Sequence, residues 1–434
     1  MPSSPLPRTS ASRALTAALS RRTLLAGAGA GAAALALTAC GSNDGGTGAG
    51  GGDGGLSQWY HQYGEDGVQQ AVEDWAKKYE AADVTVAWTL GDYASKLSSR
   101  LLSGSGVDVF ENNAIDPSSA RKGLYADLTD LMDPVKDQFS EVALKPVTID
   151  GKIWGIPMIT DPQLLFYRPS LLEAAGVAVP TTFEELMQAG IDLTTGDVKG
   201  LWLGNDGGAG VFSGAVPVAA GVGLLNDDNT QVTFDTPEVA AGFAALRAAY
   251  AADAMLLGAP TDWWDPTSFN GGLAAITWQG MWALPAMIEA FGDDVAVMAI
   301  PPVGGSTTSA VMVSQWNEQV AAKASDVEKS KALAKAQWLD DEAFQKEFAV
   351  GFGFHVPPRT AVAASTTELQ DGLAKETVDL TDQWGYTAGP FWAPAMGTAL
   401  TDAVTRIVTE GADPATELAA ASKTAQQTLD SLAS

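Results

Sequence analysis

The sequence is poor in cysteine, histidine and basic residues, and each shortage excludes a class of protein. One cysteine cannot form an internal disulfide, and with only two histidines beside it few soft ligands remain for a structural zinc site. The 434 residues hold 25 Lys and Arg against 52 Asp and Glu, which gives a net charge of -27. Nucleic acids and anionic lipid surfaces are bound through clustered Lys and Arg, so the charge argues against both kinds of partner.

Signatures of common enzymes are also missing. The sequence contains no HExxH, GxSxG, Walker A or CxxC motif. His61 and His355 are far apart in the chain, and each suits a loop or rim position better than a catalytic one. We therefore expect no catalytic residue, no cofactor and no metal. One enzyme class stays open as the alternative, a secreted carbohydrate-active hydrolase with two carboxyl groups about 5–9.5 Å apart across a sugar.

The N-terminal segment differs from the rest in charge. Residues 1–39 contain four arginines and no acidic residue, so 21 basic residues remain against 52 acidic ones and the rest of the chain carries -31. Arg21-Arg22 before the apolar run 24–39 resembles a twin-arginine export signal. At 16 residues the run is short for a bilayer span, which needs roughly 20 residues, so an uncleaved anchor is the weaker interpretation.

The apolar run ends in Leu-Thr-Ala-Cys, which resembles a bacterial lipobox and implies lipidation of Cys40, the only cysteine. Residues 40–55 are rich in glycine and cannot form a core, so we expect a flexible tether between the lipid and a folded body. This arrangement predicts a protein held at the extracellular face of the cell membrane by acyl chains.

From residue 56 the pattern alternates between strands and helices. Helices are predicted over 68–79 and 93–102, and strands over 84–88 and 107–110. The alternation favours a parallel sheet with crossover helices, and such sheets bind ligands beyond the carboxyl ends of their strands. Polar and aromatic side chains that follow the first and third strands are therefore candidate ligand contacts, namely Trp59, His61, Gln62, Asn112, Asn113 and Asp116.

Several segments together resemble one known family. They are Gly-Lys-Ile-Trp-Gly-Ile-Pro at 151–157 continuing to Tyr-Arg at 167–168, Gly-Val-Asp-Val-Phe at 106–110, Phe-Asn-Gly-Gly at 269–272 continuing to Gln-Gly-Met-Trp at 279–282, and the later series 295–302, 328–341, 351–359 and 391–408. Their order and content resemble bacterial extracellular solute-binding proteins of the sugar-binding family 1 type, which includes maltose-binding proteins. Arg168, Leu273 and Met281 depart from the family pattern.

The resemblance implies an α/β fold of the two-lobe periplasmic-binding-protein type (type II), with parallel-rich sheets and a ligand cleft between the lobes. We expect the chain to cross between lobes near 156–165, 299–304 and 339–346. Lobe 1 would comprise 56–160 plus 304–340, and lobe 2 would comprise 161–303 plus 341–434. The implied function is capture of a neutral sugar or oligosaccharide by cleft closure and its delivery to the membrane permease of an ABC importer with a cytoplasmic ATPase. A monomer is expected.

Sugars are bound by hydrogen-bond acceptors for their hydroxyls and by flat aromatic rings for their C–H faces. The resemblance assigns Asp161 and Trp282 to ligand contact, with Thr160 and Gln163 beside them, and matches Trp392 to a late aromatic of the maltose-binding relatives. Trp263 and Trp264 in a predicted loop, and Trp316 after the predicted strand 295–300, complete the candidates. Trp75, Trp88 and Trp338 are spaced like core residues.

Overall fold

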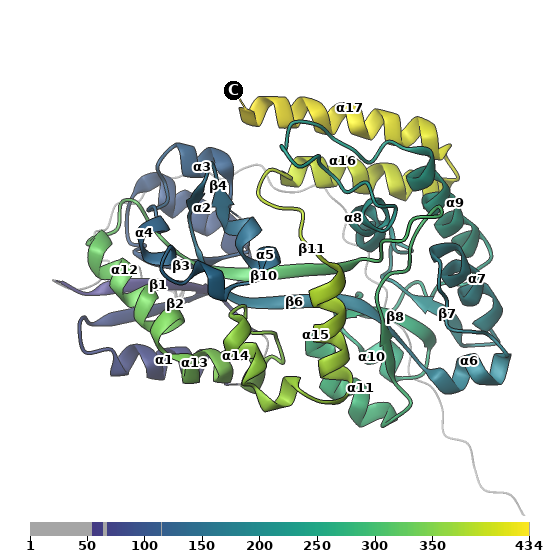
Figure 1. Ribbon diagram of the computed structural model, residues 1–434, viewed down its shortest axis with the longest axis horizontal. Helices are drawn as coiled ribbons and strands as arrows, with labels where there is room; N and C mark the ends of the chain where they lie inside the picture. Colours follow the sequence, from purple (N-terminus) through teal and green to yellow (C-terminus); the bar gives the residue numbers. More distant parts are fainter. Residues whose placement is uncertain (1–53, 64–66, 114, 434) are drawn as a thin grey trace, which may run out of the picture. The chain divides into compact units, whose positions relative to one another are not determined.

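The computed structural model describes residues 54–63, 67–113 and 115–433 (Figure 1). The expected export segment, the lipidation site Cys40 and nearly all of the expected tether lie outside the described residues. In the described part, no helix combines the length and the apolar character that crossing a membrane requires.

Strands from distant parts of the sequence join in one mixed sheet of order β2-β1-β3-β10-β6-β8-β7, with β11 beside β10 and β9 beside β6. A separate pair is formed by β4 and β5. The strands are β1 (Leu56–His61), β2 (Val84–Thr89), β3 (Val109–Asn112), β4 (Thr148–Ile149), β5 (Lys152–Ile153), β6 (Ile156–Tyr167), β7 (Lys199–Trp202), β8 (Ala274–Gly280), β9 (Ala296–Met298), β10 (Val311–Val320) and β11 (Gly385–Tyr386).

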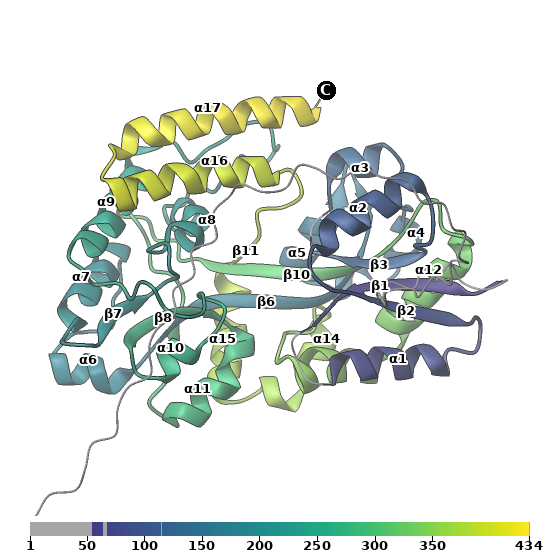
Figure 2. The same cartoon turned by 180° about the vertical axis from the view of Figure 1, so that it is seen from behind.

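Helices cover both faces of this sheet, and the last of them, α17, ends at the C-terminus (Figures 1 and 2). They are α1 (Val68–Lys78), α2 (Tyr93–Ser103), α3 (Pro117–Arg121), α4 (Thr129–Met132), α5 (Glu141–Leu144), α6 (Pro169–Ala175), α7 (Phe183–Leu193), α8 (Ala209–Ala219), α9 (Pro237–Ala251), α10 (Thr267–Asn270), α11 (Leu284–Phe291), α12 (Val327–Lys335), α13 (Glu342–Lys346), α14 (Thr360–Ala364), α15 (Gly372–Trp384), α16 (Pro394–Thr405) and α17 (Pro414–Ala433).

Short 3-10 and π turns extend or link these helices. The 3-10 turns are η1 (Lys136–Gln138), η2 (Lys145–Val147), η3 (Met281–Ala283) and η6 (Thr367–Leu369), and the π turns are η4 (Ala336–Asp340), η5 (Glu347–Phe352) and η7 (Arg406–Glu410). Three of the α-helices therefore continue directly into a π turn, namely α12 into η4, α13 into η5 and α16 into η7.

The parallel arrangement expected for the first strands is confirmed, because β1 pairs in parallel with both β2 and β3. The middle of the sheet is antiparallel instead, since β10 runs opposite to β3 and β6, and β6 runs opposite to β8. The strand predicted over 295–300 is present as β9, and Trp316 follows it in the chain, but Trp316 itself lies inside β10, a strand that was not predicted. Alternating hydrophobicity does not mark β10, in which Gln315, Asn317 and Glu318 are buried polar residues.

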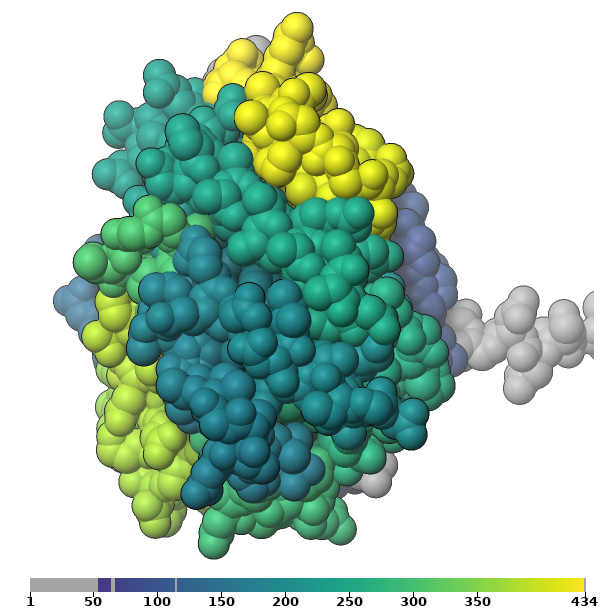
Figure 3. Space-filling model, turned by 90° about the vertical axis from the view of Figure 1, so that its right-hand side faces the viewer, coloured from purple at the N-terminus to yellow at the C-terminus, as the bar shows by residue number. Residues whose placement is uncertain are grey.

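The buried hydrophobic residues form two cores. The first core packs around β1–β3, where it includes Tyr60, Phe110 and Trp338, and it extends along the sheet to Phe269 and Met281 beside β8. The second core packs around β7 and α7–α9 and includes Phe183 and Phe243. Figure 3 looks onto this end of the protein and shows α6 and α7 (blue-green) on the same face as α17 (yellow).

The assignment of residues 341–434 to lobe 2 stays a prediction. Phe344, Phe348 and Leu369, all from this range, are buried in the first core. Residues 396–429, from α16 and α17, contribute side chains to the second core instead. The crossing predicted near 339–346 also stays a prediction, as do the lobe boundaries.

The two long strands β6 and β10 connect the cores and pair with each other along most of their length. At one end β10 also pairs with β3, through residues 317–320, and at the other end with β11, through residues 311–312. Between these two contacts, residues 313–316 are paired on one side only, with β6. The candidate site lies on this stretch.

Candidate functional site

The end of β1 places an aromatic stack against the centre of β10. The rings of His61 and Trp316 are 4.1 Å apart at centroid distance, with planes 13° from parallel. Glu111, from the neighbouring strand β3, is fully buried and accepts hydrogen bonds from the His61 backbone N–H and from the Tyr63 hydroxyl, and it also contacts His61 Nδ1. Because a buried carboxylate fixes the imidazole, His61 is a rigid support for the Trp316 ring.

A second histidine contacts the centre of β6. His355 Nδ1 forms a short contact with Asp161 Oδ1, and both side chains are buried. The His355 ring lies directly over Gly353, where an added Cβ would be 2.0 Å from Nε2. Next to it, the backbone of Thr160 exchanges hydrogen bonds with that of Val356. The glycine and this bridge therefore fix His355 against Asp161.

Tryptophans gather where β8 ends. Trp282 donates its Nε1–H to the Trp264 backbone oxygen at 3.1 Å, and its ring is 6.1 Å from that of Trp263. Trp263 also packs on Trp278, at 4.6 Å. The Trp282 ring folds back over Gly280, where an added Cβ would be 1.8 Å from the nearest ring carbon. Only a glycine at position 280 leaves room for this ring position.

The strand register brings these groups together on one face. Asp161 pairs with Ser314, Ile159 with Trp316, and Gln163 with both Met312 and Gly280. Paired residues and residues two positions apart point to the same side of a sheet, so Trp316, Asp161 and Gln163 share a face. Gln163 Nε2 donates to Ser314 Oγ at 3.1 Å across this face. We call Trp316, Asp161, Gln163, His61 and Trp282 the hinge-face cluster.

Other predicted contacts are placed differently. The Trp59 ring lies 5.6 Å from the Arg100 guanidinium of α2, and Trp392 packs edge-on against Phe234 of the second core. Asp116 caps α3 through the backbone N–H groups of Ser118 and Ser119. Gln62 and Asn113 are exposed, and Asn112 is half-buried with its carbonyl accepting from Asn317. In the described part of the chain, these contacts of Trp59, Trp392 and Asp116 are thus made with residues outside the hinge-face cluster. The role of all six residues as ligand contacts stays a prediction.

Sequence reasoning missed the residues that hold the cluster in place. Glu111 is part of a predicted strand end, yet its full burial depends on β10, which was not predicted. His355 was assigned to a loop or rim, whereas it is buried against Asp161. The two histidines of the chain are the one signal that could have pointed to these residues. Both lie at the cluster, and each contacts a carboxylate. As expected, Asp108 is structural and accepts from the backbone N–H of Ser57 at 2.7 Å.

A network of buried polar groups lies under the His61–Trp316 stack. Glu318 is fully buried beside Glu111 in the β3–β10 register, and burial raises its pKa to about 8. Gln58 Nε2 donates to Glu318 Oε1 at 2.7 Å. Burial likewise raises the pKa of Glu111, although its contact with His61 opposes the rise. Near neutral pH a protonated Glu318 avoids placing two like charges side by side.

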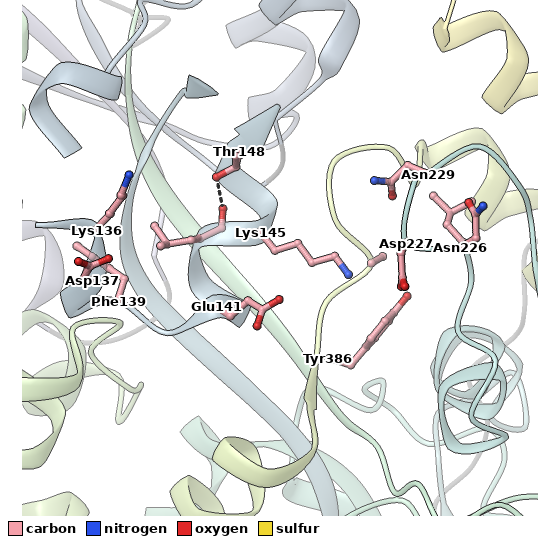
Figure 4. Close-up of a pocket in the computed structure, with 13 residues that line it drawn as sticks. Lys136, Asp137, Phe139, Glu141, Lys145, Thr148, Asn226, Asp227, Asn229 and Tyr386 are labelled. Atoms are coloured by element: carbon pink, nitrogen blue, oxygen red, sulfur yellow. Dashed lines mark hydrogen bonds between the residues drawn. The ribbon is translucent and has the colours of Figure 1, made fainter. Parts of the chain in front are cut away.

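One cavity in the described part, of about 820 Å³, is lined by residues of the α5–η2 region, the loop 225–229 and Tyr386 (Figure 4), and it includes no residue of the hinge-face cluster. A smaller cavity, of about 210 Å³, is lined in part by Thr160 and Val356, the chain neighbours of Asp161 and His355. In the same described part, no group of three or more His, Cys, Asp and Glu is arranged to hold a metal ion. The hinge-face cluster offers aromatic rings, a carboxylate and an amide, which are groups that can stack on a ligand and form hydrogen bonds with it.

Known proteins resemble this chain in sequence and in fold. Residues 70–377 match the family model described as bacterial extracellular solute-binding protein, which is more than two thirds of the chain. The arabinooligosaccharide-binding protein of Bacillus subtilis (strain 168) is 30% identical over 115 residues, which cover 25% of this chain and 27% of the relative. The match thus spans about a quarter of that relative's length.

Solved structures share the fold over nearly their whole length. The GacH receptor of Streptomyces glaucescens, solved unliganded and with acarbose, has a TM-score of 0.74 and 21% identity, covering 87% of this chain and 98% of that one. Maltose-bound MalE3 of T. maritima has a TM-score of 0.70 and 19% identity, covering 86% and 99%. These likenesses confirm the two-lobe periplasmic solute-binding fold. Together with the family match, they show that the chain belongs to the bacterial extracellular solute-binding proteins.

Proposed function

We propose that this protein is a lipid-anchored receptor that captures a neutral sugar or oligosaccharide outside the cell and delivers it to the permease of an ABC importer. The observation that carries the proposal is the hinge-face cluster. It combines two half-buried tryptophans, Trp316 and Trp282, with the acceptor Asp161 and the amide of Gln163. Stacking rings beside hydroxyl-binding groups suit a sugar, which is apolar on its C–H faces and polar at its rim.

Charge favours a neutral ligand over an anionic one. Beyond residue 39 the chain carries 52 acidic against 21 basic residues. The buried carboxylates Asp161 and Glu111 each contact a histidine, and none of the five residues of the cluster is a Lys or Arg. An anionic ligand would therefore lack a strong cationic partner at the cluster. The relatives named above support the same class, since their names or bound molecules are arabino-oligosaccharide, acarbose and maltose.

Capture would use groups that come from separate elements of the fold. His61 ends β1, Trp282 follows β8 in η3, and Trp316 and Asp161 lie on β10 and β6. A ligand that contacts all of these groups stabilises the arrangement in which they are close together. Closure is then a population shift driven by contacts made only in the closed state, and the permease would recognise that state.

Calorimetric titration with a panel of mono- to oligosaccharides, amino acids and anions tests the ligand class. We expect one saccharide to release heat, and Trp282→Ala to weaken its affinity by about 2 kcal/mol, roughly 30-fold, as truncation of a stacking anchor does. Trp75→Phe is the control, because the Trp75 ring packs on Tyr79 and Phe344, neither of which belongs to the cluster. Binding of a peptide or anion with no saccharide response would overturn the ligand class. Equal affinities in wild type and Trp282→Ala would overturn the site.

Anchoring is tested separately. In cells that express the full chain, we expect the protein to fractionate with membranes and to incorporate labelled palmitate. Cys40→Ala should release the protein into the soluble fraction, because Cys40 is the only cysteine that could be lipidated. Membrane association that persists in Cys40→Ala, with no label in the wild type, would instead indicate an uncleaved N-terminal anchor.

A further inference from the structure

The 820 Å³ cavity is a second candidate for ligand binding, and it lies apart from the hinge-face cluster. One wall comes from the segment 136–148, and the other comes from residues 225–229 with Tyr386 and Ala388. Gln315 Nε2 donates to the Ala143 backbone oxygen in α5, so α5 packs on the face to which Gln315 points. Neighbouring residues of a strand point to opposite faces, and this wall is therefore across the sheet from Trp316.

The two walls belong to different cores. Phe139 is buried in the first core, whereas Leu225, Tyr386 and Ala388 pack against the second. Figure 4 shows the side chain of Lys145 extending from one wall toward Tyr386 on the other. A molecule in the cavity would contact both cores at once. The volume lies within the range of about 300–1,000 Å³ that small-molecule sites occupy.

Charged groups of both signs line this cavity. In the described part of the chain, Glu141, Asp227 and Lys145 form no ion pair and no side-chain hydrogen bond, whereas Asp137 acts electrostatically on Lys136. The other lysine of the lining, Lys136, is paired with Asp133 at 2.9 Å. Lys145 Nζ lies 5.5 Å from the centroid of the Tyr386 ring, and its alkyl chain packs on Gly389. The cavity is therefore lined by carboxylates that can accept hydrogen bonds, by the Lys145 ammonium and by the Tyr386 ring.

We infer that this cavity is a second saccharide site that bridges the two cores. Sugar hydroxyls both donate and accept, so one neutral ligand can serve the carboxylates of Asp227 and Glu141 together with the ammonium of Lys145. The Tyr386 ring supplies an apolar surface for a C–H face. The inference rests on the proposed function for the chemical class of the ligand, but it concerns different residues.

Protection of Lys145 from acylation tests the site on the full chain. An amine-reactive ester is applied with and without the saccharide identified by calorimetry, and labelling is followed by mass spectrometry. At about ten times Kd the saccharide should slow the labelling of Lys145 about tenfold. Lys152, which is paired with Asp127 at 2.9 Å and is absent from the cavity lining, is the internal control and should label at an unchanged rate.

Variants separate the two sites. Protection should be lost in Tyr386→Ala, weakened in Asp227→Asn, and kept in Asp228→Asn, a matched control because Asp228 does not line the cavity. It should also persist in Trp282→Ala, which removes a ring of the hinge-face cluster only. Loss of protection in Trp282→Ala would overturn the inference, because Lys145 would then be reporting on the first site.

Two further outcomes distinguish the inference from the proposed function. If the Trp282-dependent heat is present but no saccharide protects Lys145, the second site is refuted and the proposed function stands. If an amino acid or inorganic anion protects Lys145 and saccharides do not, the ligand class of this cavity is wrong. Failure of the proposed function is seen independently, as the absence of any Trp282-dependent saccharide heat.

Discussion

Substitution of Gly280 by alanine should weaken ligand binding without touching the ligand. The new Cβ would be 1.8 Å from the nearest carbon of the Trp282 ring, whereas ordinary contact begins at 3.4 Å, so the ring must move by at least 1.6 Å. The displacement breaks the 3.1 Å hydrogen bond to the Trp264 carbonyl, worth about 1 kcal/mol. It also disturbs the packing on Trp263, worth about 0.5–1.5 kcal/mol. We expect affinity for the saccharide to fall by about 2 kcal/mol, roughly 30-fold.

A double-mutant cycle with Trp282→Ala isolates the cause. If Gly280 acts only by leaving room for the Trp282 ring, Gly280→Ala should not change the affinity further in the Trp282→Ala background. Calorimetry gives the affinities, and urea unfolding gives the stabilities. The control is Gly351→Ala, because a Cβ there meets nothing closer than Glu347 Cγ at 3.8 Å. Equal losses of affinity for Gly280→Ala in the wild-type and Trp282→Ala backgrounds would refute the reasoning.

Four other substitutions test three separate features. Burial raises the pKa of Glu318 to about 8, so its protonated form stabilises the fold fully below the unfolded pKa, near 4.5, and this stability is lost as the pH rises through 8. In urea unfolding, the free energy of unfolding of Glu318→Gln should therefore fall less steeply over this pH range than that of the wild type. An equally steep fall in the two proteins would contradict the prediction. Asp161→Asn should lower saccharide affinity at least about tenfold. His355→Gln keeps a hydrogen-bond donor and should lower this affinity less. If calorimetry shows the larger loss of affinity in His355→Gln, a positioning role for His355 is refuted. Arg168→Met breaks the half-buried pair with Asp294 and should lower the free energy of unfolding by about 1–2 kcal/mol at unchanged affinity, and changed affinity would show that this pair belongs to the site.

Local pattern predicted the first strands and helices well, because β1 to β3 and their crossover helices bury the face that their own periodicity marks. The helix that begins at Phe183 also has a local signal, because Thr182 caps it in a capping box with Glu185. β10 could not be found in this way. Its polar residues Gln315, Asn317 and Glu318 are buried because they bond to one another and to groups on distant elements, and a sequence window contains none of those partners.

Like the fold, the candidate site could be predicted from the sequence only in part. Asp161 and Trp282 were identified through motifs that a family resemblance supplies, and the register of β6 with β8 and β10 brings their neighbourhoods together. Trp59 and Trp392 were nominated because aromatic residues near strand ends or motif ends suit a cleft, but packing against Arg100 and Phe234 uses part of their surface. Residue type and position on the chain indicate which side chains are available, whereas their direction depends on tertiary contacts.

The one-sided pairing of β10 has a mechanical consequence. Residues 313–316 lack a neighbour on their outer edge, because β3 ends its pairing at Asn317 and β11 ends at Met312. Bending costs least where a sheet is only two strands wide, so deformation of this protein should concentrate on these four residues and their β6 partners. The same stretch carries Trp316 and Ser314. The part of the backbone that bends most easily would therefore also carry side chains that contact the ligand. Ligand binding and bending of the sheet would then be coupled.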